Sequence, residues 1–143
     1  MDTILLDTDV FSFLLRQRPE GKDVLADLYR PHIEARLVAI SFVTVGELYY
    51  GAERRKWGPN RIEALETKVK QTVVVPYDLQ LCKAYAKLKS GIRTATGSHR
   101  TIGDNDLWIA ACAVRHAIPL VTHNRRHFEG IHNLKIVTEA PPL

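Results

Sequence analysis

The sequence predicts an α/β fold in which a central parallel sheet carries helices on both faces. Short runs of aliphatic and β-branched residues alternate along the chain with longer segments of helical periodicity. This alternation is typical of parallel strands that are connected by helices packed on the sheet. The chain has 143 residues, of which 45% are hydrophobic and 25% charged. That composition fits one globular domain, which we expect to span residues 1–143.

Five short apolar segments are predicted to be strands. Residues 3–6 read Thr-Ile-Leu-Leu and residues 72–75 read Thr-Val-Val-Val. Residues of this kind pack well on a pleated, buried surface. The predicted strands are residues 3–6, 37–40, 72–75, 118–121 and 134–137.

The segments between the strands have helical spacing. In residues 22–30, for example, Val24, Leu25 and Leu28 share one face. Glycine and proline residues mark the boundaries between neighbouring helices. The predicted helices are residues 10–15, 22–30, 44–56, 60–70 and 78–90, and a sixth that begins at Asp104.

Acidic or amide side chains lie just past the apolar runs. Asp7 follows the first predicted strand, Glu47 lies beyond the second, and Asn124 comes after the fourth. Asp104 and Asp106 begin a further amphipathic segment. Because segments that leave the carboxyl ends of parallel strands converge on one edge of the sheet, we expect these side chains to share a site. Carboxylates gathered there need a cation to neutralise them, so the sequence predicts a site for a hard metal ion.

The first two acidic positions also have a structural interpretation. Asp7 can cap the helix that follows it, although Asp9 can do so equally well and would leave Asp7 free for the site. Thr44 and Glu47 match a capping box, in which the glutamate bonds back to the start of its own helix. The same oxygens of Glu47 cannot cap the helix and face the metal site at once.

The later positions have similar alternatives. Asp104, Asn105 and Asp106 crowd a predicted helix N-terminus, where negative charge is favoured. We expect one of them to cap the helix and at least one aspartate to face the metal, with Asp106 the stronger candidate and Asp104 the second. Asn124 can bind a metal, orient a metal-bound water or form a turn.

The donor types bear on the identity of the metal. Oxygen ligands favour Mg²⁺ or Mn²⁺. Zinc is disfavoured although His123 and His127 are four residues apart, because no glutamate lies between them as in the metalloprotease motif. Arg125 and Arg126 also stand in that segment and would oppose a cation.

Taken together, these segments resemble the PIN-domain ribonucleases, in particular the VapC-type toxins of toxin–antitoxin pairs. The matching segments are residues 5–10, 45–51, 102–111 and 120–124, with Phe128 beyond them. The resemblance implies a three-layer PIN-like fold and cleavage of RNA by metal-activated water. It implies that Asp7, Glu47 and Asp106 are catalytic and bind the metal, and that Asp104 or Asn124 assists through water.

The sequence departs from the family pattern at two positions. Asn124 stands where the family often has aspartate, which lowers the charge of the site. Asp9 stands where a small polar residue is common, and its carboxylate adds either to the site or to the helix cap. The alternatives are a PIN-like nuclease in RNA processing outside any toxin–antitoxin pair and a catalytically silent RNA-binding module.

The resemblance also implies an RNA substrate, a cognate antitoxin and a homodimer. A net charge of +4 and a pI of about 9.2 permit nucleic-acid binding without establishing it. Of the basic residues we expect two or three to hold RNA phosphates and the others to be solvated. The candidates are Arg54, Arg55, Lys56, Arg93, Arg100, Arg125 and Arg126.

Nothing in the sequence suggests a membrane partner. No apolar run approaches the roughly 20 residues needed to cross a bilayer. Residues 1–4 lack the basic region of a signal peptide. We therefore expect a cytoplasmic protein in which Cys82 and Cys112 are buried, reduced thiols.

Overall fold

A computed structural model describes residues 2–16, 21–92 and 102–142. Its five parallel strands form one sheet in the order β3-β2-β1-β4-β5. All five predicted strands are confirmed, although the last three are shorter than expected. The strands are β1 (Thr3–Leu6), β2 (Leu37–Ser41), β3 (Val73–Val75), β4 (Leu120–Val121) and β5 (Ile136–Val137).

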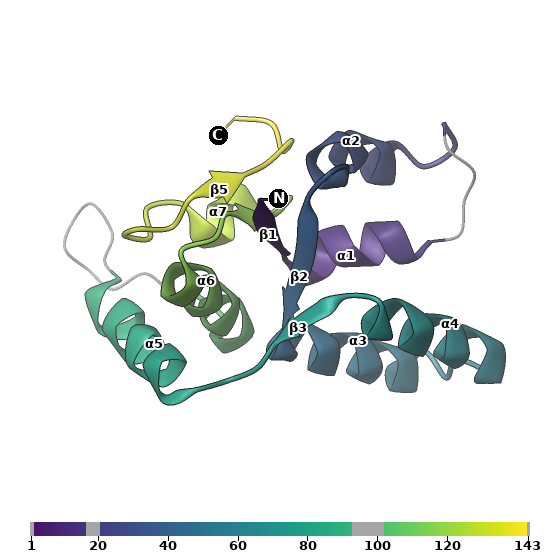
Figure 1. Cartoon of the computed structure of the whole chain (residues 1–143), viewed down its shortest axis with the longest axis horizontal. Coiled ribbons are helices and arrows are strands. Elements are labelled where there is room, and N and C mark those ends of the chain that lie inside the picture. Colours follow the sequence, from purple (N-terminus) through teal and green to yellow (C-terminus); the bar gives the residue numbers. More distant parts are fainter. Residues whose placement is uncertain (1, 17–20, 93–101, 143) are drawn as a thin grey trace.

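Helices cover both faces of this sheet, which confirms the predicted three-layer arrangement (Figure 1). The four helices on one face are α1 (Thr8–Leu15), α2 (Val24–Ile33), α3 (Phe42–Arg54) and α4 (Pro59–Lys70). The helices that pack on the other face are α5 (Leu79–Gly91), α6 (Asp104–His116) and α7 (Arg125–Phe128). No helix in the described part of the chain is long and apolar enough to span a membrane.

The central strand contributes side chains to two separate cores. Ile4 and Leu6 pack against α1 to α4, whereas Leu5 packs against α5 to α7. This division follows from the pleat of a strand, in which successive side chains point to opposite faces. It explains why the strands are apolar at successive positions and not at alternate ones.

The end of α6 explains why β4 is short. Ala117 adopts a left-handed conformation with φ of 54°, and the Ile118 amide bonds to the Ala113 carbonyl at 3.0 Å. This is the pattern of a Schellman-type helix end. Ile118 therefore belongs to the turn that ends the helix, and the strand begins only at Leu120.

One smaller expectation, on the cysteines, is wrong, and the apolar face of α2 lies partly toward solvent. The buried face of α2 consists of Ala26 and Tyr29, whereas Val24 is 74% exposed and Leu28 is 38% exposed. Tyr29 takes the core position because its ring is buried while its hydroxyl reaches polar partners beyond the helix. Both cysteines are free, but Cys82 lies on the exposed side of α5 and only Cys112 is buried.

The strand order places a topological switch point beside β1. The chain passes from β1 to β2 and β3 on one side, and later returns to β4 and β5 on the other side of β1. Asp7 follows the carboxyl end of β1, and Thr122 follows the carboxyl end of β4. Ligands of open parallel sheets bind in the crevice at such a point.

Candidate metal centre

Asp7 lies at the switch point with only 3% of its surface exposed. One carboxylate oxygen accepts a hydrogen bond from the Val10 amide at 2.9 Å and so caps α1, and the other accepts one from the hydroxyl of Thr122. Of the two possible caps, Asp7 takes the role and Asp9 does not, because α1 begins at Thr8 and Asp9 lies inside its first turn. Asp7 therefore serves as the helix cap and faces the switch point with the same carboxylate.

The surroundings of Asp7 disfavour its charged form. Its pKa is raised from 3.8 to about 7, mainly by burial and in smaller part by the charges of Asp9 and Asp106, against the lowering effect of the bonds from Thr122 and Val10. Among the described residues, no lysine, arginine or histidine pairs with Asp7. A buried carboxylate with acidic neighbours and no basic partner is the arrangement that a bound cation stabilises.

Asn124 approaches the same group from the β4 side. Its side-chain amide donates to the carboxylate of Asp9, and its backbone amide donates to the Thr122 hydroxyl at 3.0 Å. Asn124 precedes α7 but makes no side-chain capping bond, because its side chain is directed toward Asp9. Asp9 thus belongs to the site and not to the cap.

Asp106 completes the acidic group from the start of α6. Its carboxylate bonds to the ring of His127 at 2.7 Å, with 30% of the side chain exposed. Burial raises its pKa and the charge of Asp9 adds to this, whereas His127 acts in the opposite direction. Asp7, Asp9 and Asp106 are close enough for their charges to affect one another.

Asp104 is directed away from this group. Its carboxylate accepts bonds from the Tyr85 hydroxyl at 3.0 Å and the Lys89 ammonium at 3.3 Å, and both lower its pKa. Residues two apart on a helix do not face the same side, so Asp104 and Asp106 have different partners. The expectation that one acidic or amide residue caps α6 is also wrong, since Gly103 holds the cap position and no side chain bonds there.

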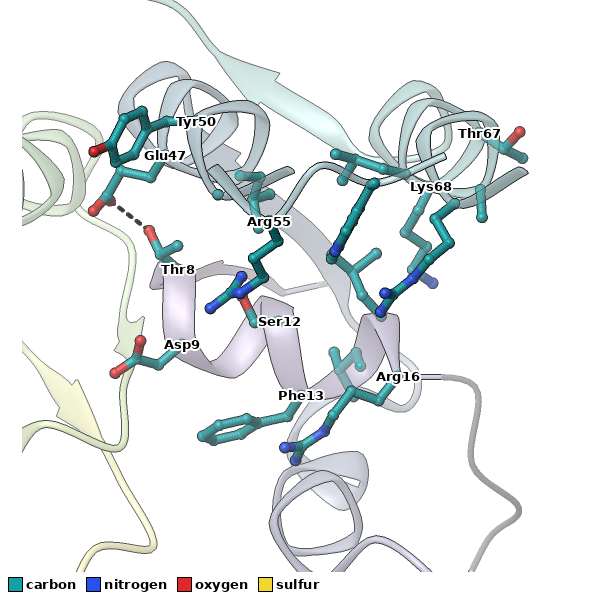
Figure 2. Close-up of a pocket in the computed structure, with 18 of the residues that line it drawn as sticks. Thr8, Asp9, Ser12, Phe13, Arg16, Glu47, Tyr50, Arg55, Thr67 and Lys68 are labelled. Carbon is teal, nitrogen blue, oxygen red and sulfur yellow. Dashed lines mark hydrogen bonds between the residues drawn. The ribbon is translucent and has the colours of Figure 1, made fainter. Parts of the chain in front are cut away.

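Glu47 lies deeper in its helix than the sequence suggests. Ser41 caps α3 by accepting from the Val43 amide at 3.1 Å, so Glu47 falls in the second turn and the predicted capping box is not formed. The Glu47 carboxylate instead accepts a bond from the Thr8 hydroxyl at 2.7 Å (Figure 2). Glu47 is therefore tied to the residue directly after Asp7.

Each acidic side chain that faces the site is already bonded to a protein donor. Asp7 is bonded to Thr122, Asp106 to His127 and Glu47 to Thr8. Within residues 2–16, 21–92 and 102–142, no three His, Cys, Asp or Glu side chains are grouped closely enough to hold one ion. The all-oxygen character of the carboxylates fits Mg²⁺ or Mn²⁺.

The predicted RNA-binding arginines are only partly described. Arg93 and Arg100 lie outside the described residues. Arg125 donates to the Ala140 carbonyl at 3.5 Å, and Arg126 is exposed on α7. Arg54 and Arg55 line a groove of about 1480 Å³ that starts at the acidic site and runs between α1, α3 and α4 (Figure 2).

Sequence reasoning did not identify three polar residues of the site. Thr8 and Thr122 orient Glu47 and Asp7 through their hydroxyls, and His127 is the partner of Asp106. Thr8 and Thr122 each stand one or two residues past a buried strand, which is the same signal that identified Asp7. His127 was considered only as a zinc ligand.

Comparison with known proteins identifies the family of the chain. The family model of the PIN domain matches residues 4–133. The chain therefore belongs to the PIN-domain family. The fold that was implied by the sequence resemblance is confirmed.

Particular relatives cover nearly the whole chain. The VapC ribonuclease Y4jK of Sinorhizobium fredii is 34% identical over 133 residues, 89% of this chain and 91% of the relative. The ribonuclease VapC1 of Haemophilus influenzae strain R2866 is 30% identical over 131 residues, 92% of this chain and 93% of the relative.

Solved structures show the same likeness. The crystal structure of VapBC-1 from nontypeable Haemophilus influenzae matches with a TM-score of 0.75 at 29% identity, over 95% of this chain and 97% of the other. VapBC-5 from Mycobacterium tuberculosis, a member of the VapBC family of toxin–antitoxin systems, matches with a TM-score of 0.67 at 25% identity, over 96% of this chain and 99% of the other.

Proposed function

We propose that this protein is a metal-dependent endoribonuclease of the VapC type and the toxin of a toxin–antitoxin pair. Its family membership and the ribonuclease names of relatives that match about nine tenths of the chain support the activity. The likeness to VapBC structures supports a cognate antitoxin as partner. A homodimer and action on RNA in the cytoplasm belong to the same proposal.

One observation carries the metal dependence. Asp7 is buried at the switch point, beside two further carboxylates, and its pKa of about 7 reflects an unfavourable buried charge. A divalent ion bound beside such a group strongly stabilises its charged form. The proposed ligands are Asp7, Asp106 and Glu47, and the structure adds Asp9 as a neighbour of the same charge.

When bound, a Mg²⁺ or Mn²⁺ ion supplies Lewis-acid charge that lowers the pKa of water and stabilises charge on a phosphate. The protein's own residues prepare the ligands. Thr122 holds one oxygen of Asp7, Thr8 holds Glu47, and His127 holds Asp106. These donors orient the carboxylates, as outer partners of metal ligands commonly do.

The roles of the remaining predicted residues differ. Asn124 is proposed to position Asp9 and the segment after β4 through its side-chain amide. Asp104 is proposed to stabilise the packing of α6 on α5 through Tyr85 and Lys89, and we omit it from the metal ligands.

The experiment is cleavage of labelled RNA by the purified protein in Mn²⁺, in Mg²⁺ and in EDTA, with Asp7→Asn as the test variant. Asparagine remains a good helix cap, so the fold should be kept. The matched control is Asp78→Asn, because Asp78 caps α5 through the Leu81 amide at 2.7 Å and pairs with Arg115, at the far end of α6 from Asp106.

We expect the wild type and Asp78→Asn to cleave RNA only with a divalent ion. Asp7→Asn should lose at least about 100-fold in rate, as is usual when a key electrostatic group is removed. Equal cleavage by Asp7→Asn, or full activity in EDTA, contradicts the proposal. For the toxin role, expression of the wild type but not of Asp7→Asn should arrest bacterial growth, and the cognate antitoxin should relieve the arrest.

A further inference from the structure

We propose that the groove between α1, α3 and α4 binds the segment of single-stranded RNA that flanks the cleaved phosphate. This inference rests on the proposed function and identifies where the substrate lies beyond the acidic site. The groove has a volume of about 1480 Å³. Thr8, Asp9 and Glu47 line its acidic end, so it is continuous with the candidate metal centre.

The charge of the groove changes along its length. Away from the acidic end it is lined by the four cations Arg54, Arg55, Arg61 and Lys68 and, among the described residues, by Glu63 as the one acidic residue beyond Asp9 and Glu47. In the part of the chain that the structure describes, none of these four cations pairs with a carboxylate. Arg16 also lines the groove but is bound to the buried Asp23 at 2.8 Å, so we assign it a structural role.

Arg55 is placed where the acidic and basic parts meet. Figure 2 shows its side chain leaving α3 and crossing the groove toward Ser12 on α1. A Cβ atom on Gly51 would lie 3.3 Å from Nη1 of Arg55, which is a close contact. The glycine one turn earlier therefore leaves space for the guanidinium to lie across the helix. A cation at this place can hold a phosphate next to the one at the metal centre.

The basic part continues along α4. Arg61 and Lys68 are seven residues apart, which places them on the same side of the helix and roughly 10 Å apart along its axis. The Arg61 guanidinium lies over the Trp57 ring, 4.4 Å from its centre. Tyr50, which is 65% exposed, lines the groove nearer to the acidic end.

Cations without acidic partners beside an exposed aromatic ring, here that of Tyr50, are features by which proteins bind single strands of nucleic acid. The cations follow the phosphates, and bases stack on such rings. The acidic end alone would repel RNA, so it needs the bound metal ion, whereas the basic part does not. The groove therefore complements the negative charge of an RNA strand that has one phosphate at the metal centre and its neighbouring phosphates beside the cations.

The test measures binding of a fluorescein-labelled single-stranded RNA to the full chain in EDTA, by fluorescence anisotropy over a range of salt concentrations. The test variant is Arg61→Ala/Lys68→Ala. The control is Lys70→Ala/Lys83→Ala, which removes the same charge from exposed positions on α4 and α5 that do not line the groove.

Each phosphate contact with a single strand contributes about 0.7 to the slope of log affinity against log salt. We expect the test variant to lower that slope by about 1.4 and to bind about 25-fold more weakly at roughly 0.1 M salt. The control should bind like the wild type. A second variant, Arg55→Ala, should raise KM for RNA cleavage with little change in kcat.

Equal affinity of the test variant and the wild type overturns the inference, as does an equal loss in both double variants. If the test variant no longer binds the antitoxin but binds RNA as tightly as the wild type, the groove is a protein-docking site and the inference is also wrong. In either case the wild type still cleaves RNA, and the proposed function stands. A wild type that neither binds nor cleaves RNA overturns both.

Discussion

The carboxylate of Asp7, after β1, accepts a hydrogen bond from the hydroxyl of Thr122, after β4. The same hydroxyl accepts a bond from the Asn124 amide at 3.0 Å, so its single hydrogen is directed to Asp7. The contact joins the two strands at the switch point of the sheet. It also lowers the pKa of Asp7, against the effect of burial. Thr122 therefore keeps this acid available for a cation.

Thr122→Val should weaken metal binding. Valine has nearly the shape of threonine but cannot donate, so the pKa of Asp7 should rise further and a proton should compete better with the metal. We expect a loss of about 10- to 100-fold in Mn²⁺ affinity near neutral pH, as for other outer partners of metal ligands. Calorimetric titration measures it, with Thr122→Ser as the control that keeps the hydroxyl. Unchanged affinity in the valine variant would remove the role assigned to this bond.

The metal-free protein should lose stability as the pH rises from about 4 to about 7. In this window the folded protein keeps a proton on Asp7 that the unfolded chain has released, because the pKa of Asp7 is 3.8 unfolded and about 7 folded. The free energy of unfolding should therefore fall by up to about 4 kcal/mol across the window and then level off. Urea denaturation at a series of pH values measures this slope.

Asp7→Asn should remove most of that slope, leaving the smaller part that the raised pKa of Asp106 contributes. Asp78→Asn should keep it, since the pKa of Asp78 is lowered and its contribution changes only below the window. A slope that is the same in the wild type and in Asp7→Asn would show that Asp7 is ionised in the metal-free protein.

Thr8→Val should reduce RNA cleavage without unfolding the protein. The Thr8 hydroxyl holds the Glu47 carboxylate at 2.7 Å and lies 3.0 Å from the Thr44 hydroxyl. Without it Glu47 is free to rotate, and we expect kcat/KM to fall about tenfold. Thr8→Ser should retain nearly full activity. Equal rates for Thr8→Val and the wild type would mean that Glu47 does not need this partner.

Tyr29→Phe should destabilise the segments that follow β4 and β5. The Tyr29 hydroxyl lies 2.6 Å from Nδ1 of His123 and accepts a bond from the Glu139 amide at 3.0 Å. Loss of the hydroxyl leaves both groups without this partner, which should lower the free energy of unfolding by about 1–3 kcal/mol. Thermal denaturation measures the change. Tyr77→Phe, at an exposed position, is the control and should melt like the wild type.

The strands and helices could be predicted because their signals are local. A run such as residues 3–6 is apolar at successive positions, and the fold buries both of its faces. The positions of Asp7, Asp106 and Asn124 could be predicted for a related reason, since each follows an apolar run or begins a helix. Their convergence then follows from the parallel sheet.

The partners of these residues could not be predicted, because they are distant in the sequence. Asp7 and Thr122 are 115 residues apart, as are Asp9 and Asn124. The start of α3 two residues before the expected position moved Glu47 out of the first turn and into contact with Thr8. Helix boundaries of this kind depend on which side chain caps the helix, and several side chains could do so.

The central claim is that the acids at the switch point exist to hold a divalent ion. Calorimetric titration of Mn²⁺ into metal-free protein tests it most directly, at a pH about one unit above the pKa of Asp7. We predict saturable binding by the wild type and by Asp78→Asn, and none by Asp7→Asn. Binding of equal strength by Asp7→Asn, or no binding by the wild type, would contradict the account.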